Sequence, residues 1–161
     1  MPRSAPWYAL ALVVVLFDQL TKHWISANFR YAEVQPVTSF FNLVLTHNQG
    51  AAFSFLADAA GWQRGFFVAI ALIAIVVIVV LLARYAGEKL FSLSLALILG
   101  GALGNVVDRI ALGYVVDFLD FHLAGRHWPA FNVADSAISV GAVLMVAESL
   151  FPRAKRTQAP R

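Results

Sequence analysis

The sequence predicts an all-α membrane protein built on four transmembrane helices, and its composition and hydropathy pattern carry this prediction. Of the 161 residues, 60% are apolar and only 13% are charged, whereas about a quarter of the residues of a soluble domain are charged. Four stretches hold about 20 mostly apolar residues each, the length that crosses the hydrocarbon core of a bilayer. An ordinary soluble fold and a disordered chain are therefore excluded.

Length, charge and cysteine content narrow the classes further. A chain of 161 residues fits one domain, and we expect a single membrane domain over residues 1–161. The net charge of +3 is too small to indicate a nucleic-acid partner. Because the chain has no cysteine, a disulfide framework, a thiol nucleophile and a cysteine-ligated metal are all excluded.

Each predicted span has its own character. Asp18 and Lys22 interrupt the first, the second contains no charge, and the third ends in glycines followed by polar residues. The first span could be taken for a cleaved signal peptide, but polar residues from Asp18 to Lys22 stand in place of a small-residue cleavage site. We therefore expect it to be retained. The spans are predicted at about 7–25, 65–83, 90–107 and 131–151.

The distribution of basic residues predicts the orientation of the spans, because cytoplasmic flanks and short loops carry an excess of Lys and Arg. Seven of these residues fall on the side that holds both termini, and five fall on the other. We therefore expect both termini in the cytoplasm. The first group comprises Arg3, Arg84, Lys89, Arg153, Lys155, Arg156 and Arg161, and the second comprises Lys22, Arg30, Arg64, Arg109 and Arg126.

The two outer loops hold most of the polar residues. In the first loop, the aromatic and β-branched run Phe40–Thr46 favours a strand, and Asn48-Gln49-Gly50 favours a turn. The stretch from about Phe55 to Phe66 mixes large apolar with polar residues, which is typical of a short interfacial helix. We expect a small extracytoplasmic sheet or hairpin resting on the membrane surface, and a second outer loop over about 109–130.

Two aspartates, Asp117 and Asp135, form the candidate catalytic pair. Asp117 lies just beyond the third span and Asp135 lies near the start of the fourth, so the second loop can fold back and bring them together. Two carboxylates a few ångströms apart cannot easily both ionise, and one then keeps a proton. Such a pair can activate water as a base and protonate a leaving amine as an acid. The alternative is that each aspartate caps a helix or pairs with an arginine.

Other polar residues near the ends of the spans have structural and functional interpretations. Asp18 and Lys22 are four residues apart and fit an intrahelical ion pair. The glycines of Gly100–Gly104 form a GxxxG face suited to close helix packing. Asn105 and Arg109 share one helix face, where Arg109 fits an acidic neighbour, a substrate carbonyl or a lipid phosphate.

Several other functions are weaker candidates. His47, His122 and His127 lack the regular spacing of a metal site, and Ser136 lacks a nucleophile elbow, which disfavours a metallopeptidase and a serine hydrolase. A proton-coupled transporter is an alternative because intramembrane acids mark ion pathways, although these acids gather at one interface. A non-catalytic scaffold that uses the glycine face is a second alternative, and it leaves the aspartate pair unexplained.

Five short motifs follow one another along the chain. They are Asp18-Gln19-Leu20-Thr21-Lys22, Asn48-Gln49-Gly50-Ala51-Ala52-Phe53, Gly100-Gly101-Ala102-Leu103-Gly104-Asn105-Val106-Val107-Asp108-Arg109, Gly113-Tyr114-Val115-Val116-Asp117-Phe118 and Phe131-Asn132-Val133-Ala134-Asp135. In this order the motifs are highly specific, and the whole chain resembles the bacterial lipoprotein signal peptidases, also called signal peptidase II.

This resemblance implies an aspartic endopeptidase of the bacterial cytoplasmic membrane that removes the signal peptide from prolipoproteins, cutting before a diacylglyceryl-modified cysteine. Asp117 and Asp135 look like its catalytic dyad. By the same resemblance, substrate binding and dyad support fall to Asn48, Gly50, Asn105, Arg109 and Asn132, and support of the fold falls to Asp18, Lys22 and Asp108.

The resemblance also implies a setting for this site. The first outer loop would form a sheet cradle with an interfacial helix as its lid, and the active site would lie at the outer, periplasmic interface. Its partners would be prolipoproteins, membrane lipid and globomycin-type inhibitors, with no nucleic acid. We expect a monomer that needs no cofactor and no metal.

Overall fold

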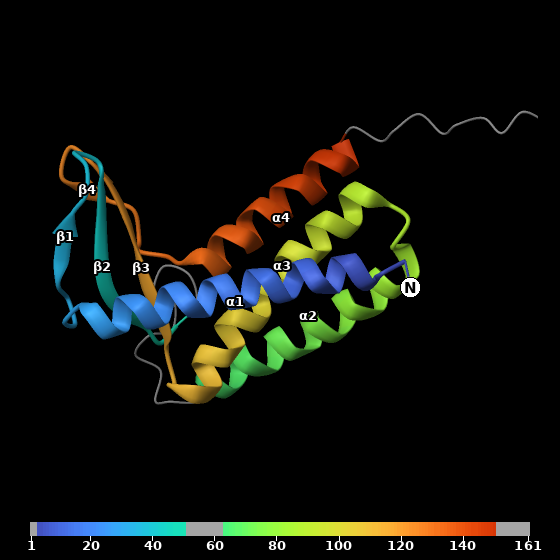
Figure 1. The fold of residues 1–161 in the computed structure, drawn as a ribbon, viewed down its shortest axis with the longest axis horizontal. Helices are drawn as coiled ribbons and strands as arrows, with labels where there is room; N and C mark the ends of the chain where they lie inside the picture. The colour runs from blue at the N-terminus through green and yellow to red at the C-terminus, as the bar shows by residue number, and fades with distance from the viewer. Residues whose placement is uncertain (1–2, 51–62, 151–161) are drawn as a thin grey trace, which may run out of the picture.

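The computed structural model describes residues 3–50 and 63–150. Within these residues, four helices are long and apolar enough to cross a membrane, as predicted. They form a bundle with a small sheet at one end and the N-terminal end of the chain at the other (Figure 1). The helices are α1 (Ala5–Asn28), α2 (Gln63–Tyr85), α3 (Lys89–Ala111) and α4 (Val133–Leu150).

Helix α3 is the centre of the bundle, because it contacts α1, α2 and α4. Two of its glycines allow α1 and α4 to pack closely against it. A Cβ atom on Gly100 would lie 2.6 Å from the Cβ of Val14 in α1, and one on Gly101 would collide with the backbone oxygen of Ala134 in α4. The glycine face predicted from the GxxxG pattern therefore packs within this chain, and Gly101, outside that pattern, seats α4.

A sheet of four antiparallel strands, counted within the described residues, has the order β1-β2-β3-β4. The strand expected over Phe40–Thr46 is present as β2. The second outer loop, expected over about 109–130 with no strand assigned to it, supplies β3 and β4, because its β-branched and aromatic residues pair with β2. The strands are β1 (Val34–Pro36), β2 (Phe41–Asn48), β3 (Val115–Leu123) and β4 (Arg126–His127).

One irregularity in the pairing of β2 with β3 decides which side chains share a face of the sheet. Asn42 pairs with Asp120 and Thr46 pairs with Asp117, so four steps along β2 match three along β3. Side chains alternate between faces, and one extra residue reverses the alternation. Asn48 therefore lies on the same face as Asp117, whereas in a regular ladder it would lie on the face of Asp120.

The sheet is held to the bundle from two sides. Val116 and Phe118 of β3 pack against Ile25 and Phe29 at the end of α1. On the other side, Phe131 forms an isolated β-bridge with Leu119, in which its N–H donates to the Leu119 oxygen at 3.1 Å.

This bridge corrects the start of the fourth span, which was expected at about residue 131. Phe131 is tied to β3, and α4 begins only at Val133. The interfacial helix expected over about 55–66 falls largely outside the described residues, and its last part, from Gln63 on, is the beginning of α2.

Candidate active site

A cavity of about 730 Å³ lies between the sheet and the adjoining ends of α3 and α4. Asp117 from β3 and Asp135 from α4 both line it, so the fold brings the predicted pair to one site. Three of the predicted supporting residues, Asn48, Asn105 and Arg109, line the same cavity. Apolar side chains complete the wall, among them Trp128, Ile138 and Val140.

Asp117 is buried, with 2% of its surface exposed, and both of its carboxylate oxygens accept hydrogen bonds. The Nδ2 of Asn132 donates to Oδ1 at 2.7 Å, and the Nδ2 of Asn48 donates to Oδ2 at 3.1 Å. Burial and then the charge of Asp135 raise the pKa of Asp117 to about 7, although both amide hydrogen bonds and the charge of Lys22 act in the opposite direction. The pair therefore retains a proton close to neutral pH.

Asp135 is the third residue of α4, and Asn132 caps that helix. The backbone N–H of Asp135 donates to the Oδ1 of Asn132 at 2.9 Å, which is the usual bond of an N-cap side chain. Because this N–H can only donate, the Asn132 oxygen faces it, and the Asn132 NH₂ must face Asp117. Asn48 follows the same rule, since its oxygen accepts the N–H of Gly50 at 3.0 Å and its NH₂ faces Asp117.

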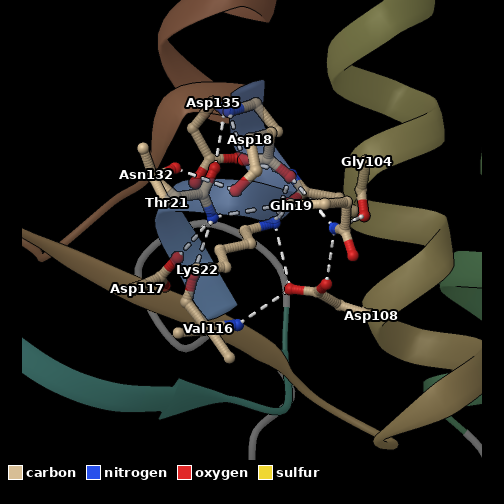
Figure 2. Close-up of polar contacts among 12 residues, drawn as sticks. Asp18, Gln19, Thr21, Lys22, Gly104, Asp108, Val116, Asp117, Asn132 and Asp135 are labelled. Carbon is tan, nitrogen blue, oxygen red and sulfur yellow. Dashed lines mark hydrogen bonds and ion pairs between the residues drawn. The ribbon is translucent and has the colours of Figure 1, made fainter. Parts of the chain in front are cut away.

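Asn105 of α3 completes the link between the two acids. Its Nδ2 donates to the Oδ1 of Asp135 at 2.7 Å, and its oxygen lies 3.4 Å from the Asn132 Nδ2. Figure 2 shows Asp117, Asn132 and Asp135 next to one another, with Lys22 alongside. The acids are therefore held by amide donors that come from three separate elements of the chain.

A buried ion cluster lies beside Asp117 and Asp135. The ammonium of Lys22 lies 2.8 Å from the Oδ2 of Asp18 and 3.0 Å from the Oδ2 of Asp108. Asp18 also accepts the N–H of Ala134 at 2.8 Å, and Asp108 accepts the N–H of Val116 at 3.1 Å. The intrahelical pair expected from the sequence is thus part of a cluster that joins α1 and α3 to the start of α4 and to β3 (Figure 2).

Gln19 belongs to this cluster and was not predicted. Its Nε2 donates to the Oδ1 of Asp108 at 2.9 Å and to the backbone oxygen of Gly104 at 3.2 Å. Gly104 is itself required there, because a Cβ atom would lie 2.6 Å from the Oδ2 of Asp18. The available signal was an amide side chain inside an apolar span, which needs a partner in the bilayer.

Arg109 reaches across the cavity to the first outer loop. Its Nη2 donates to the backbone oxygen of Gly50 at 3.0 Å, and its Nη1 lies 3.4 Å from the backbone oxygen of Asn105. The guanidinium carbon lies 5.7 Å from the ring centroid of Phe67 in α2. Gly50 therefore contacts two residues of the site: its N–H donates to Asn48, and its carbonyl oxygen accepts from Arg109.

The histidines have other surroundings. His47 stacks on Tyr114 with ring centroids 3.9 Å apart. His127 lies 2.9 Å from Asp120, which also accepts a hydrogen bond from Asn42 at 2.7 Å. Burial acts to raise the pKa of Asp120, but the bonds from Asn42 and His127 lower it overall. Within residues 3–50 and 63–150, no group of three or more His, Asp and Glu side chains is arranged to hold a metal ion.

Comparison with known proteins places the chain among peptidases. A family profile described as "Signal peptidase (SPase) II" matches residues 10–151. A protein named lipoprotein signal peptidase from Paraburkholderia phytofirmans is 62% identical over 146 residues, which is 91% of this chain and 85% of the relative. A protein of the same name from Ralstonia nicotianae is 60% identical over 145 residues, which is 90% of this chain and 84% of the relative.

Solved structures share the fold. One, described as a bacterial membrane enzyme, is 30% identical with a TM-score of 0.84, over 98% of this chain and 94% of the other. A second with the same description is 31% identical with a TM-score of 0.80, over 93% and 95%. The chain is a multi-pass bacterial membrane protein. The resemblance seen in the five motifs is confirmed, and the chain belongs to the signal peptidase II family.

Proposed function

We propose that this chain is a lipoprotein signal peptidase, a membrane-embedded aspartic endopeptidase that cuts the signal peptide from prolipoproteins just before a diacylglyceryl-modified cysteine. The family and the names of the relatives support the substrate class. The proposal rests above all on the buried Asp117 and the half-buried Asp135, which line one cavity and accept hydrogen bonds from asparagine amides.

The dyad works through one shared proton. The ionised carboxylate takes a proton from a water molecule as the water oxygen attacks the scissile carbonyl carbon. The protonated carboxylate gives its proton to the leaving nitrogen as the carbon–nitrogen bond breaks, so the pair again holds one proton. The raised pKa of Asp117, about 7, supports a singly protonated pair near neutral pH.

The supporting residues divide by what they contact. Asn48, Asn105 and Asn132 orient the dyad because their NH₂ groups donate to its carboxylates. Arg109 lines the cavity and binds the substrate backbone, and Gly50 supports it because its carbonyl oxygen accepts a hydrogen bond from the guanidinium. The ion cluster of Asp18, Lys22 and Asp108 supports the fold around them.

The sheet end of the bundle faces the periplasm and both termini face the cytoplasm. Trp7 donates to the backbone oxygen of Ala86 at 3.1 Å, so the N-terminus and the α2–α3 turn lie at one end, away from the sheet (Figure 1). Arg3, Arg84 and Lys89 belong to that end, and basic residues favour the cytoplasmic side.

The substrate reaches the dyad sideways from the bilayer. The cavity wall includes Ser139 and Val140, which are exposed on α4, a helix of membrane-spanning length. A signal peptide lying in the bilayer can enter between such lipid-facing positions and the sheet, with its cleavage site at the helix ends.

The test is cleavage of a diacylglyceryl-modified prolipoprotein by the purified protein in detergent, with and without globomycin. We expect cleavage before the lipidated cysteine, and block by the inhibitor. Absence of cleavage by the wild-type protein, with a known signal peptidase II active in the same assay, would refute the proposed function.

A further inference from the structure

Lys22 makes one contact that charge pairing does not explain. Its side chain is 3% exposed, and an ammonium carries three protons. Two of them serve the carboxylates of Asp18 and Asp108, at 2.8 and 3.0 Å. The third is donated at 2.9 Å to the Oδ1 of Asn105, a neutral amide that itself donates to Asp135 of the dyad.

This third bond decides which way the Asn105 amide points. An ammonium can only donate, so the atom that faces Lys22 must be the amide oxygen. The NH₂ group is then directed at Asp135, whose Oδ1 it meets at 2.7 Å. With the amide reversed, NH₂ would face the ammonium and oxygen would face the carboxylate, and both contacts would be repulsive.

Lys22 also contributes charge to the dyad. The charged groups that act on Asp117 and Asp135 are Lys22 and Asp18 from α1 and Arg109 from α3, and Asp108 of α3 contacts Lys22. Of the two cations, Arg109 is directed to the oxygen of Gly50. The positive charge of Lys22 lowers the pKa of Asp117, against burial and the charge of Asp135.

We propose that Lys22 is a positioning residue of the peptidase, whose ammonium fixes the Asn105 amide as a hydrogen-bond donor to Asp135. This role rests on the proposed function and goes beyond the support of the fold expected from the sequence. If Lys22 served only to pair charges, its contacts with Asp18 and Asp108 would be sufficient, and the bond to Asn105 would have no role.

The test compares Lys22→Met with the double variant Lys22→Met/Asp108→Asn, which restores the net charge of the cluster. We expect kcat to fall about 100-fold in both, as for a displaced catalytic group, with little change in KM. The alkaline limb of the kcat/KM profile should move to higher pH, because Asp117 holds the proton of the pair and the Lys22 charge no longer lowers its pKa.

Two further variants separate positioning from folding. Asn105→Ala leaves the ion cluster intact, and we expect it to lose kcat as far as the Lys22 variants do. Gln19→Leu removes bonds to Asp108 and Gly104 without touching Asn105, so we expect a lower Tm with an unchanged kcat and pH profile.

The outcomes are distinct. Wild-type kcat and pH profile in the charge-balanced double variant, or wild-type kcat in Asn105→Ala, would overturn the role of Lys22 and leave the proposed function standing. A shifted pH profile in Gln19→Leu would also overturn it, because the cluster as a whole would then be responsible. Lack of cleavage by the wild-type protein refutes the proposed function itself.

Discussion

Two hydrogen bonds of the Asn132 side chain have different structural roles. Its oxygen caps α4 through the N–H of Asp135, and its NH₂ donates to Asp117. A strand residue and a helix residue are thereby held at a set separation, although each belongs to a different element. Loss of an N-cap alone costs about 1 kcal/mol, and here the position of the dyad would be lost with it.

Replacing either aspartate of the dyad tests the chemistry directly. We expect Asp117→Asn and Asp135→Asn each to lower single-turnover cleavage by about 10⁴-fold or more, and the double variant to be little worse, since groups that act as a unit are strongly non-additive. Asp120→Asn is the matched control, because Asp120 lies on the same strand but on the opposite face. At equal amounts of folded protein, loss of activity in Asp120→Asn equal to that in Asp117→Asn would show that the wrong pair has been chosen.

The raised pKa of Asp117 predicts a pH dependence of stability. Its folded value is about 7, above an unfolded value of about 4, so the folded protein binds more protons than the unfolded chain between these pH values. Stability therefore falls as pH rises through this range. We expect Asp117→Asn to have a Tm several degrees above that of the wild-type protein at pH 8, and the difference to vanish near pH 4.

Asp120 should change the pH dependence of stability in the opposite direction. Its pKa is lowered in the fold, so its contribution to stability is present at neutral pH and is lost as pH falls. Thermal melts of Asp120→Asn should therefore show a deficit at pH 7 that shrinks in acid. The same direction of change in both variants would contradict this assignment.

Arg109 should matter more than other basic residues at the sheet end. Hydrogen bonds to charged groups contribute about 1.5–3 kcal/mol when buried, so we expect Arg109→Ala to lower kcat/KM about 10- to 150-fold. Arg126 is exposed on β4, and exposed charges contribute little, so Arg126→Ala should cleave normally. Equal losses at equal expression would remove the substrate role of Arg109.

At the scale of elements, the glycines of α3 set how closely the other helices approach. Gly101 has no space for a Cβ atom, because the backbone oxygen of Ala134 occupies it. Asn132 caps α4 and Asp135 lies in its first turn, so a shift of α4 also moves Asp135 relative to Asp117.

Gly101→Ala tests this coupling between packing and chemistry. We expect a loss of stability of about 1–3 kcal/mol, as for overpacked interiors, together with reduced cleavage. Gly65→Ala in α2 is the control, since a Cβ atom there meets nothing within 4 Å. Thermal melts and cleavage rates in the same detergent give both readouts, and an unchanged Gly101→Ala would contradict the close packing of α3 and α4.

For the whole molecule, the absence of cysteine makes the topology directly testable. Single cysteines at Gly87, in the α2–α3 turn, and at Arg126, on β4, lie at opposite ends of the bundle. In intact cells we expect a membrane-impermeant maleimide to label the Arg126→Cys variant, after permeabilisation of the outer membrane, and not the Gly87→Cys variant. Labelling of both from the same side would refute the orientation inferred from the basic residues.

The membrane class, the four spans and the strand at β2 could all be predicted from the sequence, because they depend on local composition and spacing. Its motifs also predicted Asp117, Asp135, Asn48, Asn105 and Arg109 as site residues, and the fold places all five on one cavity. Asp18 and Lys22 could be paired from sequence because helical spacing places residues four apart on one face.

The way in which these residues contact one another depends on the three-dimensional fold. The extra residue in β2 brings Asn48 to the face of Asp117, and the bridge of Phe131 with Leu119 makes Asn132 a helix cap. Neither could be read locally, since strand register and bulges depend on a partner far away along the chain. Gln19 was missed for a related reason: in a bilayer the apolar face of a helix can point to lipid or to protein, so hydropathy does not tell which way a polar side chain faces.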